Sequence, residues 1–459
     1  MEEKTYLKWY NKVGYGSGDI AGNMIYAFLS SFVMIYLTGS IGLSAGIVGT
    51  LIAVSKLLDG ITGIFWGIMI DKTHSSFGKA RPWMLYGYAG CVVTLIAIFA
   101  IPVNLGAPAQ YIWFFIAYTL LDAVFYTANT IAYSTLTSLC TTNGRERTQM
   151  GVCRFLFAFA ASLLIQSATV GFVADCGGDA MAWRIVAVVY ALVGLIINTV
   201  SCLSVKELPE EEMTFGAERE QEKAKQEKYG LAEAVRLLFT NKFYLMICGV
   251  FILQQLYSVM ISTGIYYMTY VLKNENLYGV FSWAVNIPLM IALILTPALA
   301  GRWKGIYKLN LRGYALAVAG RLFVVAAAYL GSIPLMLLFT AVAAFGQGPW
   351  QGDMNAVIAS CSEYTFLTKG KRVDGTMYSG TSLGMKIGGG LGTAISGWLL
   401  EISGFSGTLD IQPASCISML HFLYLWLPLL LNICILLLLS GMRVEEINKR
   451  IKAERASAG

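Results

Sequence analysis

The chain has 459 residues, of which 56% are hydrophobic and only 13% are charged. Soluble domains are about 25% charged, so this composition excludes an ordinary water-soluble fold and indicates a protein with many membrane spans. The net charge of +6 does not predict a nucleic-acid partner, because the basic residues are distributed among short polar turns instead of forming one basic face.

Apolar runs of about 20 residues, the length that crosses the core of a bilayer, recur along the whole chain. The longest charged stretch, 205–242, separates six of these runs from six more. We therefore predict an all-α membrane protein with six-helix bundles at 1–204 and 243–441, a cytoplasmic central linker at 205–242 and a cytoplasmic tail at 442–459. The predicted spans are 14–37, 43–70, 83–102, 110–139, 149–173, 182–204, 243–272, 278–300, 311–331, 334–360, 375–401 and 415–441.

Lysine and arginine gather on alternate connections between the spans, starting from the N-terminal tail, whereas the other connections hold only Lys273. Because basic connections stay in the cytoplasm, we expect a multi-pass protein of the cell (inner) membrane with both termini cytoplasmic. Twelve helices in this arrangement are typical of a secondary transporter whose substrate binds between two parallel halves. A channel, a membrane enzyme and a signalling receptor are the alternatives.

Little in the sequence indicates enzyme chemistry. The two histidines, His74 and His421, are isolated, and neither HExxH nor GxxxxGK[ST] occurs. The nine cysteines fall mostly inside apolar runs without metal-ligand spacing, as packing residues do. Glycines of the span at 375–401 lie at membrane depth, where they favour close helix packing over nucleotide binding. We expect no enzymatic activity and no cofactor, and without an ATP site any uphill transport has to use an ion gradient.

Charged residues at membrane depth mark the candidate site, because each costs about 3 kcal/mol or more and usually faces a protein interior or a water-filled path. Lys56 and Asp59 lie on one face of the second span, where they could also neutralise each other and merely let the helix insert. At about 1.5 Å per residue, Asp59 lies about 24 Å along its span and Thr127 about 25 Å along the fourth, so the two can face each other. A carboxylate beside a hydroxyl suits Na⁺, and an isolated carboxylate can carry a proton, which leaves both ions open.

Further polar side chains lie at membrane depth on the first, fourth, fifth and eleventh spans: Asp19, Asp122, Arg154 and Lys386. Lys386 is about 17 Å in from the cytoplasmic end of its span, deep enough to need a counter-charge or a substrate. Aromatic rings at a depth suited to stacking on a sugar are those of Tyr126, Tyr133 and Trp350. In such an aromatic-rich chain, however, a single ring more often faces lipid or the core.

Three motifs carry a resemblance to a known family: GIMIDKTHSSFGKARPW at 67–83, NGRERTQMGVCRF at 143–155 and TKGKRVDGTMYSGTSLGMKIGG at 368–389. Their order and content resemble the glycoside-pentoside-hexuronide:cation symporters, the branch of the major facilitator superfamily that contains melibiose permease. The resemblance covers nearly the whole chain. It implies uptake of a sugar or glycoside coupled to Na⁺, Li⁺ or H⁺ by alternating access.

The resemblance also implies roles for single residues. Substrate-binding positions of the family match Asp19, Tyr126 and Arg154. Positions that bind the coupling cation match Asp59 and Thr127, while Lys56 stands where the family often has arginine, and Lys386 matches the family's lysine of the eleventh span. The chain departs from the family pattern at Thr62, Gly63, Thr130, Ser134 and Ser360. Because Gly63 replaces a second aspartate of the cation site, H⁺ is favoured over Na⁺, and Asp122 is a candidate to compensate.

Our hypothesis is a monomeric symporter with a central cavity for a sugar or glycoside. Substrate binding is assigned to Asp19, Tyr126, Arg154 and Lys386, and cation coupling to Lys56, Asp59, Thr62, Asp122 and Thr127, with Asp59 and Thr127 as ligands if the ion is Na⁺. Ion pairs in cytoplasmic turns would close an inner gate formed by Asp71, Arg81, Arg145, Glu363 and Arg372. Alternatives are a uniporter or exchanger, a non-sugar substrate and a non-transporting sensor on the same fold.

Overall fold

The computed structural model describes residues 5–102, 104–141, 143–208, 239–302, 306–369, 374–407, 409 and 411–458. Some helical side chains within these ranges lie outside the description, including those of Asp71 and Arg145. The described residues are almost entirely helical, which confirms the predicted all-α fold class.

Each predicted span falls on a helix or on a run of consecutive helices. The first six are α1 Trp9–Gly16 with α2 Gly18–Ile35 and η1 Tyr36–Ser40, α3 Ala45–Asp71, α4 Arg81–Phe99, α5 Ala107–Thr119 with η2 Leu120–Tyr126 and α6 Thr127–Cys140, α7 Gly144–Asp175, and α8 Ala180–Leu203. The next six are α11 Lys242–Ser262 with α12 Gly264–Tyr266 and η3 Tyr267–Val271, α13 Leu277–Arg302, α14 Ile306–Tyr329, α15 Ile333–Lys369, α16 Asp374–Ile402, and α17 Ala414–His421 with η4 Phe422–Trp426 and α18 Leu427–Gly441. A last helix, α19 Val444–Ala458, forms where only a tail was expected.

Length and composition alone make ten of these helices or runs suitable for crossing a membrane, counted over the described residues. The remaining two predicted spans correspond to α3, of 27 residues, and α16, of 29 residues. Both carry the charged positions singled out in the sequence, Lys56 and Asp59 on α3 and Lys386 on α16. The full set of twelve membrane crossings therefore stays a prediction, although helices occupy all twelve positions.

Side-chain caps fix where two of the helices begin. Asp179 accepts a hydrogen bond from the backbone N–H of Ala182 at the start of α8, at 2.8 Å. Asn241 accepts from Phe243 and Tyr244 at the start of α11, at 3.0 and 3.1 Å. These caps satisfy N–H groups that have no partner inside the first turn of a helix.

The chain folds into two compact units, as far as its residues are described. The first contains Met1–Ala224, Met268–Gly279 and Thr393–Ile417, and the second contains Lys225–Tyr267, Val280–Gly392 and Ser418–Gly459. Both units include segments from the C-terminal half of the sequence. The predicted boundaries of the bundles, linker and tail stay a prediction.

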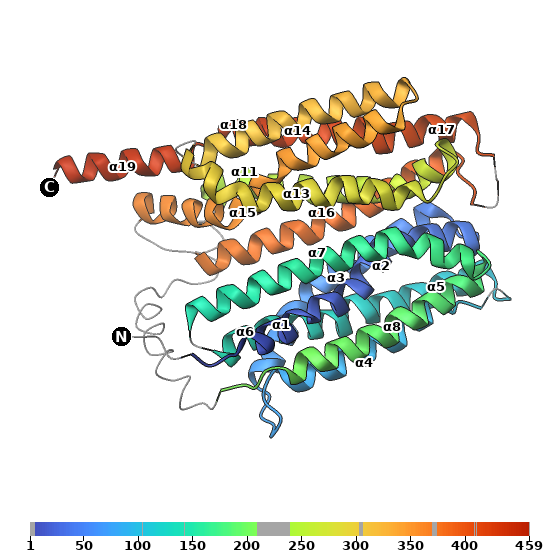
Figure 1. Ribbon diagram of the computed structural model, residues 1–459, viewed down its shortest axis with the longest axis horizontal. Coiled ribbons are helices and arrows are strands. Elements are labelled where there is room, and N and C mark those ends of the chain that lie inside the picture. Colours follow the sequence, from blue (N-terminus) through green and yellow to red (C-terminus); the bar gives the residue numbers. More distant parts are fainter. Residues whose placement is uncertain are drawn as a thin grey trace. The chain divides into compact units, whose positions relative to one another are not determined.

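Within the first unit, α2 packs against α7 and α8, and α4 packs against α6 and α8 (Figure 1). Buried apolar side chains from α1, α3, α4, α6 and α7 form one core cluster that includes Tyr15, Ile70, Met84, Leu136 and Met150. This packing brings the first, fourth and fifth predicted spans together, which are the spans that carry most of the candidate site.

Within the second unit, α14 packs along α15 and α18, α11 packs against α18, and α19 lies against α15 (Figure 1). Glycine makes the first of these contacts close: a Cβ on Gly320 would lie 2.7 Å from the backbone nitrogen of Ala343. The core cluster here is centred on Trp350, which is 1% exposed, and on Phe251 and Tyr314. Glu363 of α15 is joined to the additional helix α19 by an ion pair with Lys452, at 2.5 Å.

The fourth predicted span is not a regular α-helix. Its middle turn, η2, is a π-helix, and the hydroxyl of Thr127 donates to the carbonyl of Asp122, five residues earlier, at 2.8 Å. Such wide turns change the direction of the following side chains and are frequent at functional sites. Asp122, Tyr126 and Thr127 all lie in or beside this turn.

Candidate functional site

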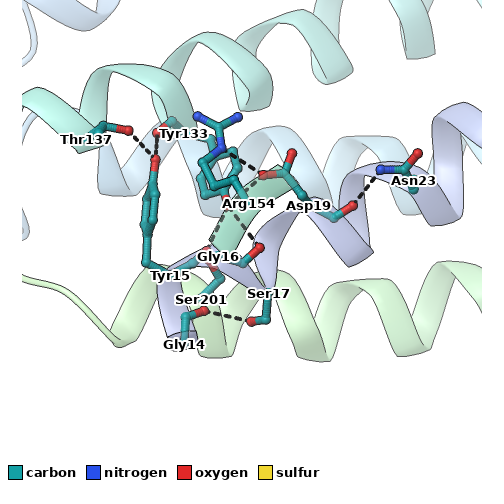
Figure 2. Close-up of polar contacts among 10 residues, drawn as sticks. All are labelled: Gly14, Tyr15, Gly16, Ser17, Asp19, Asn23, Tyr133, Thr137, Arg154 and Ser201. Carbon is teal, nitrogen blue, oxygen red and sulfur yellow. Dashed lines mark hydrogen bonds and ion pairs between the residues drawn. The ribbon is translucent and has the colours of Figure 1, made fainter. Parts of the chain in front are cut away.

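An ion pair between the first and fifth predicted spans is the centre of the first polar cluster (Figure 2). The Nε of Arg154 on α7 donates to Oδ2 of Asp19 on α2 at 2.7 Å. The hydroxyl of Tyr133 on α6 donates to the same carboxylate oxygen at 3.2 Å, and the guanidinium lies 4.1 Å from the centre of the Tyr133 ring. One carboxylate, one guanidinium and one aromatic ring therefore converge from three helices.

A second layer of hydrogen bonds holds this cluster in place. The hydroxyl of Tyr15 donates to the carbonyl of Tyr133 at 2.5 Å, and the hydroxyl of Tyr133 also reaches the carbonyl of Tyr15 at 2.8 Å (Figure 2). The hydroxyl of Ser201 donates to the same Tyr15 carbonyl at 2.7 Å. Gly18 is required where α2 crosses this layer, since a Cβ there would lie 2.6 Å from Oγ of Ser201 and 2.9 Å from the Tyr133 ring.

The ion pair is reachable from outside the protein interior. The side chains of Arg154 and Asp19 are 24% and 22% exposed, respectively, whereas Tyr15 and Tyr133 beneath them are buried. Arg154 uses its Nε toward Asp19, and a guanidinium has four more N–H donors. The cluster can thus present donors and acceptors to paired hydroxyl groups of a ligand.

The second polar cluster lies between α3 and the π-turn of the fourth span. The hydroxyl of Thr127, whose single proton is shared between the carbonyl of Asp122 and this acid, also lies within hydrogen-bond distance of Oδ1 of Asp59, as the rise per residue predicts for two side chains at one depth. The ammonium of Lys56 lies 6.0 Å from the centre of the Tyr26 ring, within the electrostatic field of Asp122 and Asp59. The cluster therefore joins one cation to two acids, and Asp122 is the stronger electrostatic partner of Lys56.

Tyr126 belongs to the second cluster. Its ring stacks on that of Tyr26, with centroids 6.3 Å apart and planes 14° apart, and Tyr26 in turn faces Lys56. Thr62 is directed elsewhere, because its hydroxyl donates to the backbone carbonyl of Asp59 at 3.3 Å. In the part of the chain that the structure describes, no group of three or more His, Cys, Asp or Glu side chains is arranged to hold a metal ion.

The structure describes only some of the remaining candidate side chains. Lys386 is half-buried on α16 and belongs to the second unit, so its assignment to the substrate site stays a prediction. Arg81 is buried, donates through Nε to the carbonyl of Cys202 at 3.3 Å and lies 4.1 Å from the centre of the Phe77 ring. The side chains of Asp71 and Arg145, and all of Arg372, lie outside the described residues. Their gating assignments, with that of Glu363, stay predictions.

Two glutamates that the sequence did not single out hold the segments around the family motifs. Both oxygens of Glu207 accept from the backbone N–H groups of Lys79, Ala80 and Arg81, at 2.7, 3.0 and 3.1 Å. Gly78 precedes this cap with a φ of +114°, a backbone conformation that favours glycine. Glu146 accepts from the N–H groups of Leu7 and Tyr6, at 3.0 and 3.2 Å. These backbone contacts had no recognisable signal, because each of these backbone partners is more than 120 residues from its glutamate in sequence.

The chain is similar to known transporters over almost its whole length. It is 26% identical to the isoprimeverose transporter of Lactiplantibacillus pentosus over 93% of this chain and 87% of that protein, and 28% identical to the uncharacterized symporter YnaJ of Bacillus subtilis (strain 168) over 91% and 88%. The crystal structure of a D-xylose-proton symporter matches with a TM-score of 0.63 at 16% identity, covering 94% of this chain and 96% of that chain, and shows the shared fold.

These likenesses agree with the predicted transporter fold and with the resemblance carried by the three motifs. With its apolar helices, the chain is a multi-pass protein of the cell membrane. Residues 14–446 match the model of the MFS/sugar transport proteins, and the chain belongs to that family, whose members are transporters and not enzymes.

Proposed function

We propose that this protein is a symporter that moves a sugar or glycoside across the cell membrane together with a cation. The observation that carries this proposal is the partly exposed Asp19–Arg154 pair above the Tyr133 ring. A carboxylate accepts from sugar hydroxyls and a guanidinium donates to them, while the buried Tyr133 ring holds the guanidinium in place. The isoprimeverose transporter, a relative along nearly the whole chain, supports a sugar as the substrate class.

Coupling is assigned to the second cluster, and H⁺ is the favoured ion. Asp59 has one hydroxyl ligand in Thr127 and an ammonium nearby in Lys56. Gly63 provides no second carboxylate, so Na⁺ at Asp59 and Thr127 would lack the charged ligands that hard cations prefer. Protonation of Asp59 needs no further ligand. Stacking of Tyr126 on Tyr26 holds the tyrosine that faces Lys56 in place.

In the proposed orientation, both termini and the central linker are cytoplasmic, in accord with the basic residues of alternate connections. The Glu207 and Glu146 contacts then lie at the cytoplasmic ends of the first unit, around the family motifs. Arg81, Glu363 and the undescribed Arg372 are assigned to closing this side during alternating access.

The test is uptake by purified protein in proteoliposomes. A panel of glycosides, pentosides and hexuronates is first screened by thermal shift, because a ligand that binds the folded state raises its apparent stability. Uptake of each binding sugar is then measured under an imposed pH gradient, a Na⁺ gradient, or neither. We expect accumulation above equilibrium with the pH gradient.

Asp59→Asn is the matched variant for coupling. It keeps the shape and the Thr127 contact but removes the titratable group, so we expect sugar binding within about threefold of wild type and loss of accumulation against a gradient. Unaltered concentrative uptake by this variant would exclude Asp59 as the coupling residue. Binding without any passage of sugar would instead identify a sensor, and accumulation of no panel sugar would point to a non-sugar substrate.

A further inference from the structure

The second unit contains a pocket, partly open to solvent, between α14, α15, the end of α18 and the start of α19. Its lining is largely apolar and includes Trp350 and Met442, and its polar contributors are Asn310, Ser360 and Glu445. The substrate and coupling clusters described above belong to the first unit, so this cavity is not part of them.

Two buried acceptors of the second unit, one at this cavity and one on the helix α15 that borders it, have no hydrogen-bond partner among the described residues. Oδ1 of Asn310 is one of them, and the Asn310 side chain is only 3% exposed while lining the cavity. Oδ2 of Asp353 is the other, and that residue is 8% exposed. Leaving such atoms without donors is costly in a protein interior, and more so for a carboxylate.

Asp353 lies on the same face of α15 as three residues that line the cavity. The residues Trp350, Asp353, Val357 and Ser360 follow one another at intervals of three and four, which places them on one face of α15. Three of the four line the cavity. Asp353 is also within electrostatic range of Glu445, which lines the cavity from α19.

The polar groups toward the cavity are short of donors. Glu445 has its charge balanced, since it accepts from Lys449 at 2.8 Å and from the backbone N–H of Ile306 at 3.0 Å. The Ser360 hydroxyl donates its proton to the carbonyl of Ala356 at 2.9 Å. Asp353 and Asn310 therefore require an occupant that brings N–H donors and positive charge.

We propose that this cavity binds an organic ammonium ion, a primary or secondary amine on a short apolar body. The N–H donors would reach Asp353 and Asn310, and the apolar body would pack on the Trp350 indole, whose face attracts cations. A bare metal ion fits less well, because the walls are apolar and the described residues supply only two unpartnered oxygens. The amine could be a soluble molecule or the headgroup of an aminophospholipid.

The test uses benzylamine as the probe and benzyl alcohol as its neutral counterpart, with the purified full-length protein in detergent. We expect benzylamine to raise the apparent Tm and to bind measurably by calorimetry, and benzyl alcohol to do neither. Asp353→Asn should weaken benzylamine binding at least tenfold. Asp175→Asn, at an exposed position at the end of α7, is the matched control and should bind benzylamine as wild type does.

A second variant, Asn310→Leu, keeps the test decisive if Asp353→Asn does not fold, and it should also weaken binding at least tenfold. Equal binding to wild type and to either folded variant would overturn the proposal, as would the absence of benzylamine binding to wild type. Nanodiscs of phosphatidylcholine, whose headgroup has no N–H, are then compared with nanodiscs containing phosphatidylethanolamine. Competition by the latter supports a lipid occupant, and full benzylamine binding in both supports a soluble amine. Sugar uptake is assayed separately, so failure here leaves the proposed symport intact.

Discussion

Two arginines at membrane depth lie in opposite environments. Arg154 of the first unit is 24% exposed, donates to the carboxylate of Asp19 and lies over the Tyr133 ring. Arg321 of the second unit is 1% exposed and donates through Nε and Nη2 to the hydroxyl of Tyr257, at 3.0 and 2.5 Å. Among the described residues, its Nη1 has no partner and no carboxylate forms an ion pair with it.

The difference shows that a charge at membrane depth does not by itself identify a substrate site. Arg154 is balanced by an acid and still has free donors at an accessible surface, so a ligand can exchange with water there. Arg321 is sealed inside its unit, where a buried charge without a counter-charge lowers stability. Arg154 and Arg321 differ in their exposure and in whether an opposite charge lies nearby, and not in their depth. Three experiments test this distinction.

The largest effect is expected from Arg154→Gln. The variant loses the charged hydrogen bond to Asp19 and the donors offered to the sugar, which we expect to lower sugar binding by about 2–3 kcal/mol, or roughly 30- to 150-fold in Kd. The Kd is measured by calorimetric titration with the panel sugar that raises the apparent Tm of the wild type most. Arg450→Gln breaks an exposed ion pair on α19 and should change nothing. Sugar affinity within threefold of wild type for Arg154→Gln would remove this pair from the substrate site.

The second largest effect is expected from Arg321→Met, and it concerns stability and not sugar binding. Replacing a buried, incompletely paired charge with an apolar side chain of similar length is often neutral or stabilising, here by about 1–2 kcal/mol, so the apparent Tm should stay or rise. Tyr257→Phe in the same background removes the hydroxyl left without its partner. Sugar affinity should remain within about threefold in both variants. A tenfold weaker sugar affinity would show that Arg321 reaches the substrate after all, in another conformation.

Much of the fold could be predicted from the sequence because the signal of a membrane helix is local. A run of 20 apolar residues suffices, and every predicted span falls on a helix. The depth estimate also predicted that Asp59 and Thr127 can face each other, because the rise per residue is the same in any α-helix. The ring beneath Arg154 was among the candidates only as an unassigned tyrosine, because its contact requires α6 and α7 to pack together.

The contacts of the two capping glutamates were not predictable in the same way. Glu207 reaches Ala80, 127 residues away, and Glu146 reaches Leu7, 139 residues away, so no local pattern encodes either pair. The π-turn that contains Asp122 was likewise not predictable, because its largely apolar sequence suits a regular α-helix equally well. α19 was read as a tail because it is charged and follows the last apolar run, yet Val444 and Asn448 pack it against the second unit.

The smallest effect is expected at Glu146, a charge as inaccessible as Arg321 but fully provided with partners. It is 2% exposed, and burial raises its pKa, but hydrogen bonds from Thr141, Leu7 and Tyr6 outweigh burial and hold the pKa below its usual value of 4.5. A carboxyl group with a lowered pKa stabilises the folded state above the pKa of the unfolded chain, and this contribution is lost as pH falls through the folded pKa. Glu146→Gln should therefore lower the stability by about 1 kcal/mol at pH 7, and this deficit should shrink as pH falls from 4.5 toward the folded pKa. Apparent Tm values from pH 7 to pH 3 measure this, with the exposed Glu446→Gln as the control. A deficit that persists unchanged at pH 3 would mean that the shape of the side chain, and not its charge, holds the N-terminal segment, and the contrast with Arg321 would then concern packing alone.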